Sequence, residues 1–375
     1  MKIELSAVKT NFDGKYCYVH ARGGITADGE FVITTQHLRI TGSDIFYGIE
    51  MVKSRDGFKT DSGIIPCKNL GRTPYLDKYE RVICDMTPLF HKKTGKLIIT
   101  GSSIVYEDDE FPKIPQRRCA AYAVYDSEKG DFDEYKLIML EDEDKYFHSG
   151  SGCCQTYEEE NGDILIPFYY LDRKGCDDSW NSCTSVAVMR CAFDGEKITV
   201  KEIGNSLTVD VPRGLGEPSI VKYGGEYFLA LRNDETGYVA KSSDGIHFGK
   251  PCELCFEHGI KAGNYNTQQH WICGGGKLYL VYTRKAGNND HIFRHRAPLF
   301  IAEFDPEKMC LVRATERIVV PERGARLGNF GCFTVNDSES YVVASEWMQG
   351  HDGNHAKCME YGSDNSIFVS KITFE

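Results

Sequence analysis

The chain has 375 residues, of which 41% are hydrophobic and 26% are charged, and this globular balance excludes a wholly disordered protein. Its 44 Lys and Arg against 55 Asp and Glu give a formal net charge of −11, which argues against nucleic acid as the main partner. No apolar run reaches the ~18–20 residues that cross a bilayer, and Glu4 is acidic where a signal peptide is apolar. We therefore expect a cytoplasmic protein with neither a nucleic-acid nor a membrane partner.

The cysteines agree with this compartment, because their number, 15, is odd and their spacing is not that of a small disulfide scaffold. Most are expected to be reduced thiols that pack as small apolar side chains. Cys252 and Cys255 form one Cys-x-x-Cys pair, but no second pair completes a four-thiolate zinc site. We expect no metal ion and no cofactor.

Six similar units follow one another along the chain. Each has an apolar strand, a Gly- or Asp-rich turn and a second strongly apolar strand, and a third strand follows most of them; the units start at Arg22, Asp85, Cys154, Glu217, Gln268 and Phe330. Their spacing of roughly 50–65 residues is that of a four-stranded propeller blade. Residues 2–8 supply a further strand that closes the last unit. The sequence predicts an all-β fold, a single six-bladed β-propeller domain over residues 1–375, with a large β-sandwich as the alternative.

Two turns carry a first resemblance to a known family. Residues 54–58 (SRDGF) and 243–248 (SDGIHF) each follow a third strand and place an Asp beside a Gly. An Asp in such a turn accepts backbone N–H bonds while the Gly takes a positive φ. The turns resemble the Asp-box turns of sialidase-type propellers, also called BNR propellers.

Polar residues at the heads of the units extend this resemblance to sialidases. Arg22 opens the first unit, Arg232 follows Glu217 by about one hairpin, and Arg296 opens a strand of the next unit. The resemblance implies that the three guanidiniums bind the carboxylate of an acidic sugar through bidentate hydrogen bonds. It also implies that Glu346, near the end of the sequence, holds Arg22.

The same resemblance implies an acid and a base. Asp44 lies in the loop that carries the family's acid/base Asp, and Glu217 stands where the family has the Glu that activates a nucleophilic Tyr. The position of that Tyr is Phe330 here, and Phe has no nucleophilic oxygen. Since two carboxyls suffice for glycoside hydrolysis, we expect Asp44 and Glu217 to act as catalytic residues on an acidic oligosaccharide.

His148 supports a second hypothesis, because it lies in a Gly-rich segment just before the third unit. The chain resembles some polysaccharide lyases with related propellers, in which Arg neutralises a uronate and a funnel His moves the proton; those lyases have Tyr where this chain has Glu217. Residues 264–271 head the fifth unit, and Gln268 and His270 offer hydrogen-bonding groups for sugar hydroxyls. A noncatalytic propeller that binds a sugar or a protein is the third hypothesis, favoured by Phe330.

Overall fold

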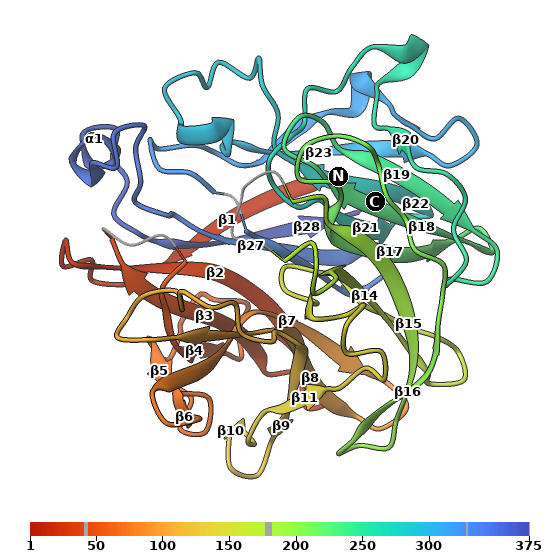
Figure 1. The fold of residues 1–375 in the computed structure, drawn as a ribbon. Helices are drawn as coiled ribbons and strands as arrows, with labels where there is room; N and C mark the ends of the chain where they lie inside the picture. Colours follow the sequence, from red (N-terminus) through yellow and green to blue (C-terminus); the bar gives the residue numbers. More distant parts are fainter. Residues whose placement is uncertain (41–43, 177–181, 328, 375) are drawn as a thin grey trace.

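The computed structural model describes residues 1–40, 44–176, 182–327 and 329–374. The strands form six sheets arranged around one axis, so the predicted six-bladed β-propeller is confirmed (Figure 1). The six inner strands face the axis; β2, for example, lies against β7 of the next blade and β26 of the last.

Blades 1 to 3 use the first half of the chain. Blade 1 consists of β2 (Tyr16–Ile25), β3 (Phe31–Arg39), β4 (Phe46–Ser54) and β5 (Ile65–Pro66). Blade 2 consists of β6 (Thr73–Tyr75), β7 (Tyr79–His91), β8 (Lys96–Tyr106), β9 (Ala120–Asp126), β10 (Asp131–Phe132) and β11 (Lys136–Ile138). Blade 3 consists of β12 (His148–Gly150), β13 (Tyr157–Glu158), β14 (Ile164–Leu171), β15 (Ser185–Phe193) and β16 (Ile198–Ile203).

Blades 4 to 6 use the rest. Blade 4 consists of β17 (Gly216–Tyr223), β18 (Glu226–Arg232), β19 (Tyr238–Ser242) and β20 (Cys252–Glu253). Blade 5 consists of β21 (His270–Gly274), β22 (Lys277–Tyr282), β23 (Leu299–Asp305), β24 (Cys310–Leu311) and β25 (Arg317–Val320). Blade 6 consists of β26 (Gly331–Asn336), β27 (Glu339–Ser345), β28 (Ile367–Thr373) and β1 (Lys2–Val8). The short helices η1 (Glu257–Gly259), η2 (Phe293–His295), η3 (Arg313–Thr315) and α1 (His355–Glu360) lie in connections.

The two ends of the chain close the ring. β1 pairs antiparallel with β28, from Lys2 opposite Thr373 to Val8 opposite Ile367, and Figure 1 shows the red first strand beside the blue last one. The predicted closure by residues 2–8 is therefore confirmed. Because the first strand is the outer strand of the last blade, its pairing with β28 joins the two ends of the chain in one sheet.

Apolar clusters fill the spaces between neighbouring blades. Ile272 and Val281 of blade 5, for example, pack with Val342 and Phe368 of blade 6. Similar clusters join blades 1 and 2, 2 and 3, 3 and 4, 4 and 5, and 6 and 1. Strands covered on both faces need apolar residues at successive positions, which explains the near-continuous apolar runs in the sequence.

The two Asp-containing turns have the same hydrogen bonds. In each, a Ser hydroxyl lies 3.0 Å from an Asp Oδ1, in the pairs Ser54–Asp56 and Ser242–Asp244. The same Asp oxygen then accepts a backbone N–H three residues later, at Lys59 in the first turn and His247 in the second. The second turn thus uses Ser242 instead of the expected neighbour at position 243. Separately, the described segments contain no helix long and apolar enough to span a membrane.

Candidate active site

The inner strands surround a cavity of about 540 Å³ at the propeller axis. This volume falls in the range of cavities that hold small ligands (~300–1,000 Å³). Every blade contributes to its lining, with His20, Asp85, His148, Glu217, Arg296 and Asn329 from blades 1 to 6 in that order. The cavity therefore brings together polar residues that are far apart in the sequence.

Three of these side chains come from β-bulges in inner strands. His20 in β2, Asp85 in β7 and Glu217 in β17 each lie at a break in strand register, and their φ angles are 58°, 59° and 43°. A bulge with a left-handed residue turns a side chain that would otherwise pack between sheets. Since this conformation is unfavourable for residues other than Gly, its repetition at a bulge in three inner strands makes these positions candidate functional residues.

His20 and Asp85 form a buried pair at the wall of the cavity. Nδ1 of His20 lies 2.6 Å from Oδ1 of Asp85, and the thiol of Cys153 donates to the same oxygen across 3.1 Å. Burial by itself raises the pKa of Asp85, but His20, Arg22 and the thiol outweigh it and hold that pKa below its usual range. Asp85 is therefore ionised at neutral pH.

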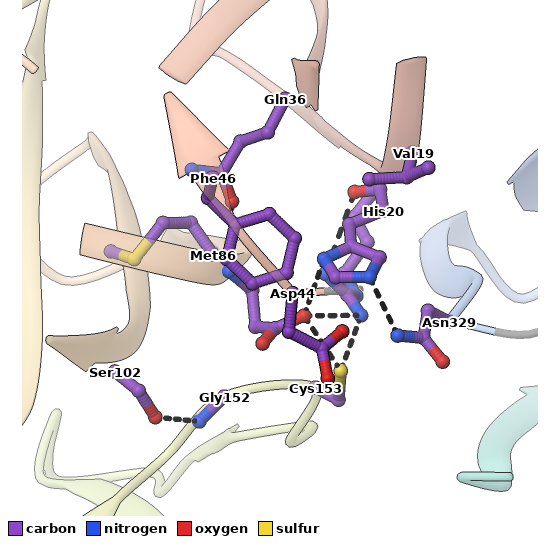
Figure 2. A network of polar contacts seen from close by, with 12 residues as sticks. Val19, His20, Gln36, Asp44, Phe46, Met86, Ser102, Gly152, Cys153 and Asn329 are labelled. Carbon is purple, nitrogen blue, oxygen red and sulfur yellow. Dashed lines mark hydrogen bonds and ion pairs between the residues drawn. The ribbon is translucent and has the colours of Figure 1, made fainter. Parts of the chain in front are cut away.

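Asn329 connects this pair to Arg296. Nη1 of Arg296 donates to Oδ1 of Asn329 across 3.2 Å. Nδ2 of Asn329 lies 2.7 Å from Nε2 of His20, as Figure 2 shows. Because a guanidinium only donates, it faces the amide oxygen and leaves the amide N–H for His20. Nε2 of His20 is then an acceptor, and the imidazole proton lies on Nδ1, the ring nitrogen nearer to Asp85.

A second amide joins Arg296 to Arg232. Oδ1 of Asn266 accepts from Nη2 of Arg296 across 2.9 Å and from Nη2 of Arg232 across 3.2 Å. Arg232 also donates to Glu217 at 2.5 Å and to Asp234 at 3.1 Å. Burial lowers the pKa of Arg232, but the carboxylates of Glu217 and Asp234 outweigh it and raise that pKa above its usual value. Arg232 is thus a neutralised cation.

The charges of Arg296 and Arg326 are offset by carboxylates much less than the charge of Arg232 is. Burial, followed by the charge of Arg232, lowers the pKa of Arg296 to about 9, and burial, followed by the charge of Arg296, lowers the pKa of Arg326. The buried Nε atoms of both arginines have no hydrogen-bond partner among the residues that the structure describes. The Arg326 guanidinium lies over Trp347, 3.5 Å from the ring centroid. This side of the cavity therefore favours an anion.

Asp44 and His148 also line the cavity, as expected of funnel residues. The backbone oxygen of Asp44 accepts a hydrogen bond from the hydroxyl of Tyr106, which holds the backbone there. Nε2 of His148 lies 2.9 Å from the carbonyl oxygen of Gln116 and therefore carries the proton. Burial, with the nearby charge of Arg118, lowers the pKa of His148 to about 4, so its imidazole is neutral at pH 7.

Three residues expected to bind substrate lie outside the cavity lining instead. Arg22, Gln268 and His270 converge on the carbonyl oxygen of Phe330, at 3.2, 3.2 and 3.0 Å, and none of the three side chains has measurable exposure. Gly331 makes this packing possible, because a Cβ there would lie 2.8 Å from Cβ of Arg22. The bulge in β2 turns His20 into the cavity. Arg22 is buried behind the cavity lining, where its Nη2 atom lies 2.8 Å from the sulfur of Cys153 in blade 3 and 3.9 Å from Oδ1 of Asp85 in blade 2.

Glu346 is buried, but its partner is not Arg22. Its carboxylate accepts from Nε and Nη2 of Arg323 across 2.9 and 2.8 Å and from the backbone N–H of Ser366. The expectation that it holds Arg22 was wrong in that respect. Glu346 follows the last residue of β27, and there it stabilises the blade 6 loops.

The sequence reasoning missed His20, Asn266, Arg326 and Asn329. His20 stands two residues before Arg22 in β2. The strand has a bulge between Val19 and Arg22, and an allowance for such a bulge would have made His20 a candidate cavity residue. The other three lie in connections between strands, where sequence pattern carries no information about direction. Within residues 1–40, 44–176, 182–327 and 329–374, no group of three or more His, Cys, Asp and Glu side chains is placed to hold a metal ion.

Comparison with known proteins identifies the fold. No protein-family model matches the sequence, and no curated protein is similar to it at a significant level. Among solved structures, a protein of unknown function from Dyadobacter fermentans is 16% identical with a TM-score of 0.67, and the alignment covers 100% of this chain and 99% of that one.

Sialidases have similar structures. A Hadza microbial sialidase, Hz136, is 12% identical with a TM-score of 0.65, and the match covers 95% of this chain and 66% of that one. A Trypanosoma rangeli sialidase in complex with sialic acid is 14% identical with a TM-score of 0.60, covering 98% and 57%. A leech intramolecular trans-sialidase is 12% identical with a TM-score of 0.62, covering 98% and 68%. The chain is therefore a sialidase-like propeller that spans about 57–68% of these sialidase chains.

Proposed function

We propose that the protein is a carbohydrate-active enzyme, a glycoside hydrolase that cleaves an acidic sugar from an oligosaccharide in the propeller cavity. The observation that carries this proposal is the juxtaposition of Arg296 and Arg326, two buried and incompletely neutralised cations, with the carboxylate of Glu217 in one cavity. The sialidase-like fold agrees with it.

In this proposal, Arg296 and Arg326 bind the carboxylate of the sugar. A sugar carboxylate beside Arg296 and Arg326 accepts charge-assisted hydrogen bonds and offsets the burial and charge repulsion that lower the pKa of both groups. Arg232 is already bonded to Glu217 and Asp234, so its first role is to orient Glu217. Binding of the anion thus fixes the sugar ring relative to the carboxylates.

Glu217 and Asp44 supply the acid and the base. Hydrolysis of a glycosidic bond needs one carboxyl that protonates the leaving oxygen and a second carboxyl that assists attack on the anomeric carbon. Arg232 holds Oε1 of Glu217, and Oε2 has no hydrogen-bond partner in the described part of the chain, so this oxygen has a free lone pair. Asp44 lines the same cavity from the loop between β3 and β4.

Kinetics of carboxamide variants test the proposal. Glu217→Gln and Asp44→Asn should each lower kcat by ~10²–10⁴-fold on an acidic oligosaccharide, because each removes a proton-transferring group. Glu303→Gln is the matched control, since Glu303 is also paired with a cation, Lys277 at 2.7 Å, but lies on β23 outside the cavity lining. Unchanged turnover in both cavity variants contradicts the proposed roles.

A second candidate is an oligosaccharide lyase that acts on a uronic acid. The observation in its favour is His148, whose imidazole is neutral, with the proton on Nε2 and a lone pair on Nδ1. A neutral imidazole can take the C5 proton next to an arginine-bound carboxylate. The C4–O glycosidic bond then breaks as the C4–C5 double bond forms, and the leaving oxygen takes up a proton, so no water is added. In that case His148→Ala abolishes product while Glu217→Gln is tolerated. Binding without any product indicates the third candidate, a noncatalytic sugar-binding propeller.

A further inference from the structure

A separate cation, Arg118, lines the same cavity between blades 2 and 3. It precedes β9, and its backbone forms a bridge with His148 of β12. The guanidinium lies 5.6 Å from the ring centroid of Phe111. Among the described residues, no hydrogen bond or ion pair to the Arg118 side chain is found.

The neighbours of Arg118 do not neutralise it. Two cavity carboxylates, Asp44 and Asp85, act with Arg118 on Cys84, and neither forms an ion pair with Arg118 among the described residues. Asp85 is already bonded to His20 and Cys153. The charge of Arg118 acts on the groups around it. Burial lowers the pKa of His148 and Arg118 adds to that effect, whereas burial raises the pKa of Cys84 and Arg118 only partly opposes that rise. Arg118 is therefore half-buried, charged and open to a ligand.

Its position is opposite the first cationic region. In a ring of six blades, blades 2 and 3 stand across the axis from blades 5 and 6. Arg118 belongs to the former, and Arg296 and Arg326 belong to the latter. The cavity of about 540 Å³ reaches all three residues, so one ligand can contact both regions.

We infer that Arg118 forms a second anion subsite, which binds a carboxylate or sulfate ester on a sugar next to the acidic sugar held by Arg296 and Arg326. The substrate class is then an acidic glycan with two anionic groups, and this identification rests on the proposed function. Two neighbours complete the subsite. Phe111, 42% exposed, offers an aromatic face, and Nδ1 of His148 accepts a hydrogen bond from a sugar hydroxyl.

His148 allows the subsite to be tested without any turnover. NMR titration of its imidazole should show that potassium sulfate, compared with potassium chloride at equal ionic strength, raises the pKa of His148, because bound sulfate offsets the charge of Arg118. In Arg118→Gln the pKa of His148 should already be raised and should not respond to sulfate. If neither sulfate nor the sugars used below shift the wild-type titration, the inference is overturned.

Affinity measurements with a matched ligand pair test the substrate class. Digalacturonate is compared with the same disaccharide in which one carboxylate has been reduced to an alcohol. Arg118→Gln should weaken binding of the diacid by about tenfold and leave the monoacid nearly unchanged, since only the diacid reaches Arg118. Arg55→Gln, an exposed variant on blade 1 outside the cavity lining, is the control and should change neither affinity.

The outcomes separate this inference from the proposed hydrolysis. If diacid binding depends on Arg118 and no product forms, the subsite stands and the hydrolase proposal fails. If product forms but Arg118→Gln binds both ligands as the wild type does, the subsite fails and the hydrolase proposal stands. An equal loss for both ligands also overturns the inference, because it indicates a general change in the cavity and not a second contact.

Discussion

Asn329 donates its side-chain N–H to Nε2 of His20 across 2.7 Å, although the two residues lie at opposite ends of the sequence. This hydrogen bond is one step in a continuous series of contacts that involves five of the six blades. The series runs, in order, through Asp85, His20, Asn329, Arg296, Asn266, Arg232 and Glu217. The guanidinium of Arg296, which we propose binds the substrate anion, is thus held by the side-chain amides of Asn329 and Asn266.

Asn329→Ala should weaken substrate binding more than it slows chemistry. The variant removes the acceptor on Nη1 of Arg296 and leaves Nε2 of His20 without its donor, but it leaves the contact between Arg232 and Glu217 intact. We expect KM for an acidic substrate to rise about tenfold with a smaller change in kcat. Asn161→Ala, in an exposed turn of blade 3, serves as the control. A fall in kcat at constant KM contradicts this account of Asn329.

Arg326→Met should make the protein more stable and a poorer binder. Arg326 is 2% exposed, and burial together with Arg296 lowers its pKa, so its charge is unfavourable in the ligand-free protein. Replacing such a cation by an apolar side chain of similar length should raise the free energy of unfolding by about 1 kcal/mol. Urea unfolding measures this value, and a thermal-shift titration with an acidic oligosaccharide measures the lost binding.

Arg232→Met is the matched comparison for that experiment. It leaves Glu217 and Asp234 without their cation, so we expect it to lower the free energy of unfolding by about 3 kcal/mol. If both methionine variants destabilise the protein equally, the contrast between a neutralised and an incompletely neutralised arginine is wrong.

Arg22→Ala should mainly lower the stability of the protein and should affect ligand binding less directly. Arg22 is fully buried and donates to the carbonyl oxygens of Phe330 and His20 and to the sulfur of Cys153. Losing these bonds and the packing against Gly331 should lower the free energy of unfolding on the order of 3 kcal/mol. Equilibrium urea unfolding checks this value. A variant with wild-type stability and lost affinity for acidic ligands instead supports the role first expected from the sequence.

Mild acid should destabilise the protein through His270. Burial, followed by the charge of Arg22, lowers the pKa of His270 to about 3, whereas the unfolded chain has a His pKa of about 6.5. Between these values the unfolded state binds a proton that the native state does not, so stability falls as the pH decreases from 6.5 toward 3. Between pH 7 and pH 5, the His270 contribution to the loss of unfolding free energy should be about 2 kcal/mol.

Two glutamine variants, one at His270 and one at His258, separate the contribution of His270 from that of the other titrating groups. His270→Gln should show a shallower loss of stability between pH 7 and pH 5 than the wild type, measured by urea unfolding at each pH. His258→Gln, in the exposed turn of η1, should follow the wild-type curve. Parallel curves for all three proteins contradict the buried, neutral state of His270.

The arrangement of blades could be predicted from the sequence because it depends on repetition. Each unit repeats an apolar strand pair and a Gly- or Asp-rich turn, and such a pattern survives small errors in strand boundaries. The closure of the ring by Lys2–Val8 was also predictable, since the last unit lacked an outer strand. The blade arrangement and the ring closure both follow from a pattern that many residues share.

The direction in which individual side chains point could not be predicted in the same way. The direction of a side chain in a strand alternates with each residue, so one bulge exchanges the face that points inward. In β2 that bulge turns His20 into the cavity, and Arg22 is buried behind the lining, in contact with Phe330 and Cys153. Asp44, His148, Glu217, Arg232 and Arg296 do line the cavity, whereas Gln268 and His270 bond to Phe330.

Mass analysis of reaction products tests the central claim most directly. The protein is first screened for binding to sialylated and uronate-containing oligosaccharides by thermal shift, and the ligands that bind are then incubated with it. Hydrolysis in the cavity predicts products that together carry one added water, and these products should be absent with Glu217→Gln. Unsaturated fragments without that water, or bound ligands that all stay intact, contradict the claim that this cavity is the active site of a glycoside hydrolase.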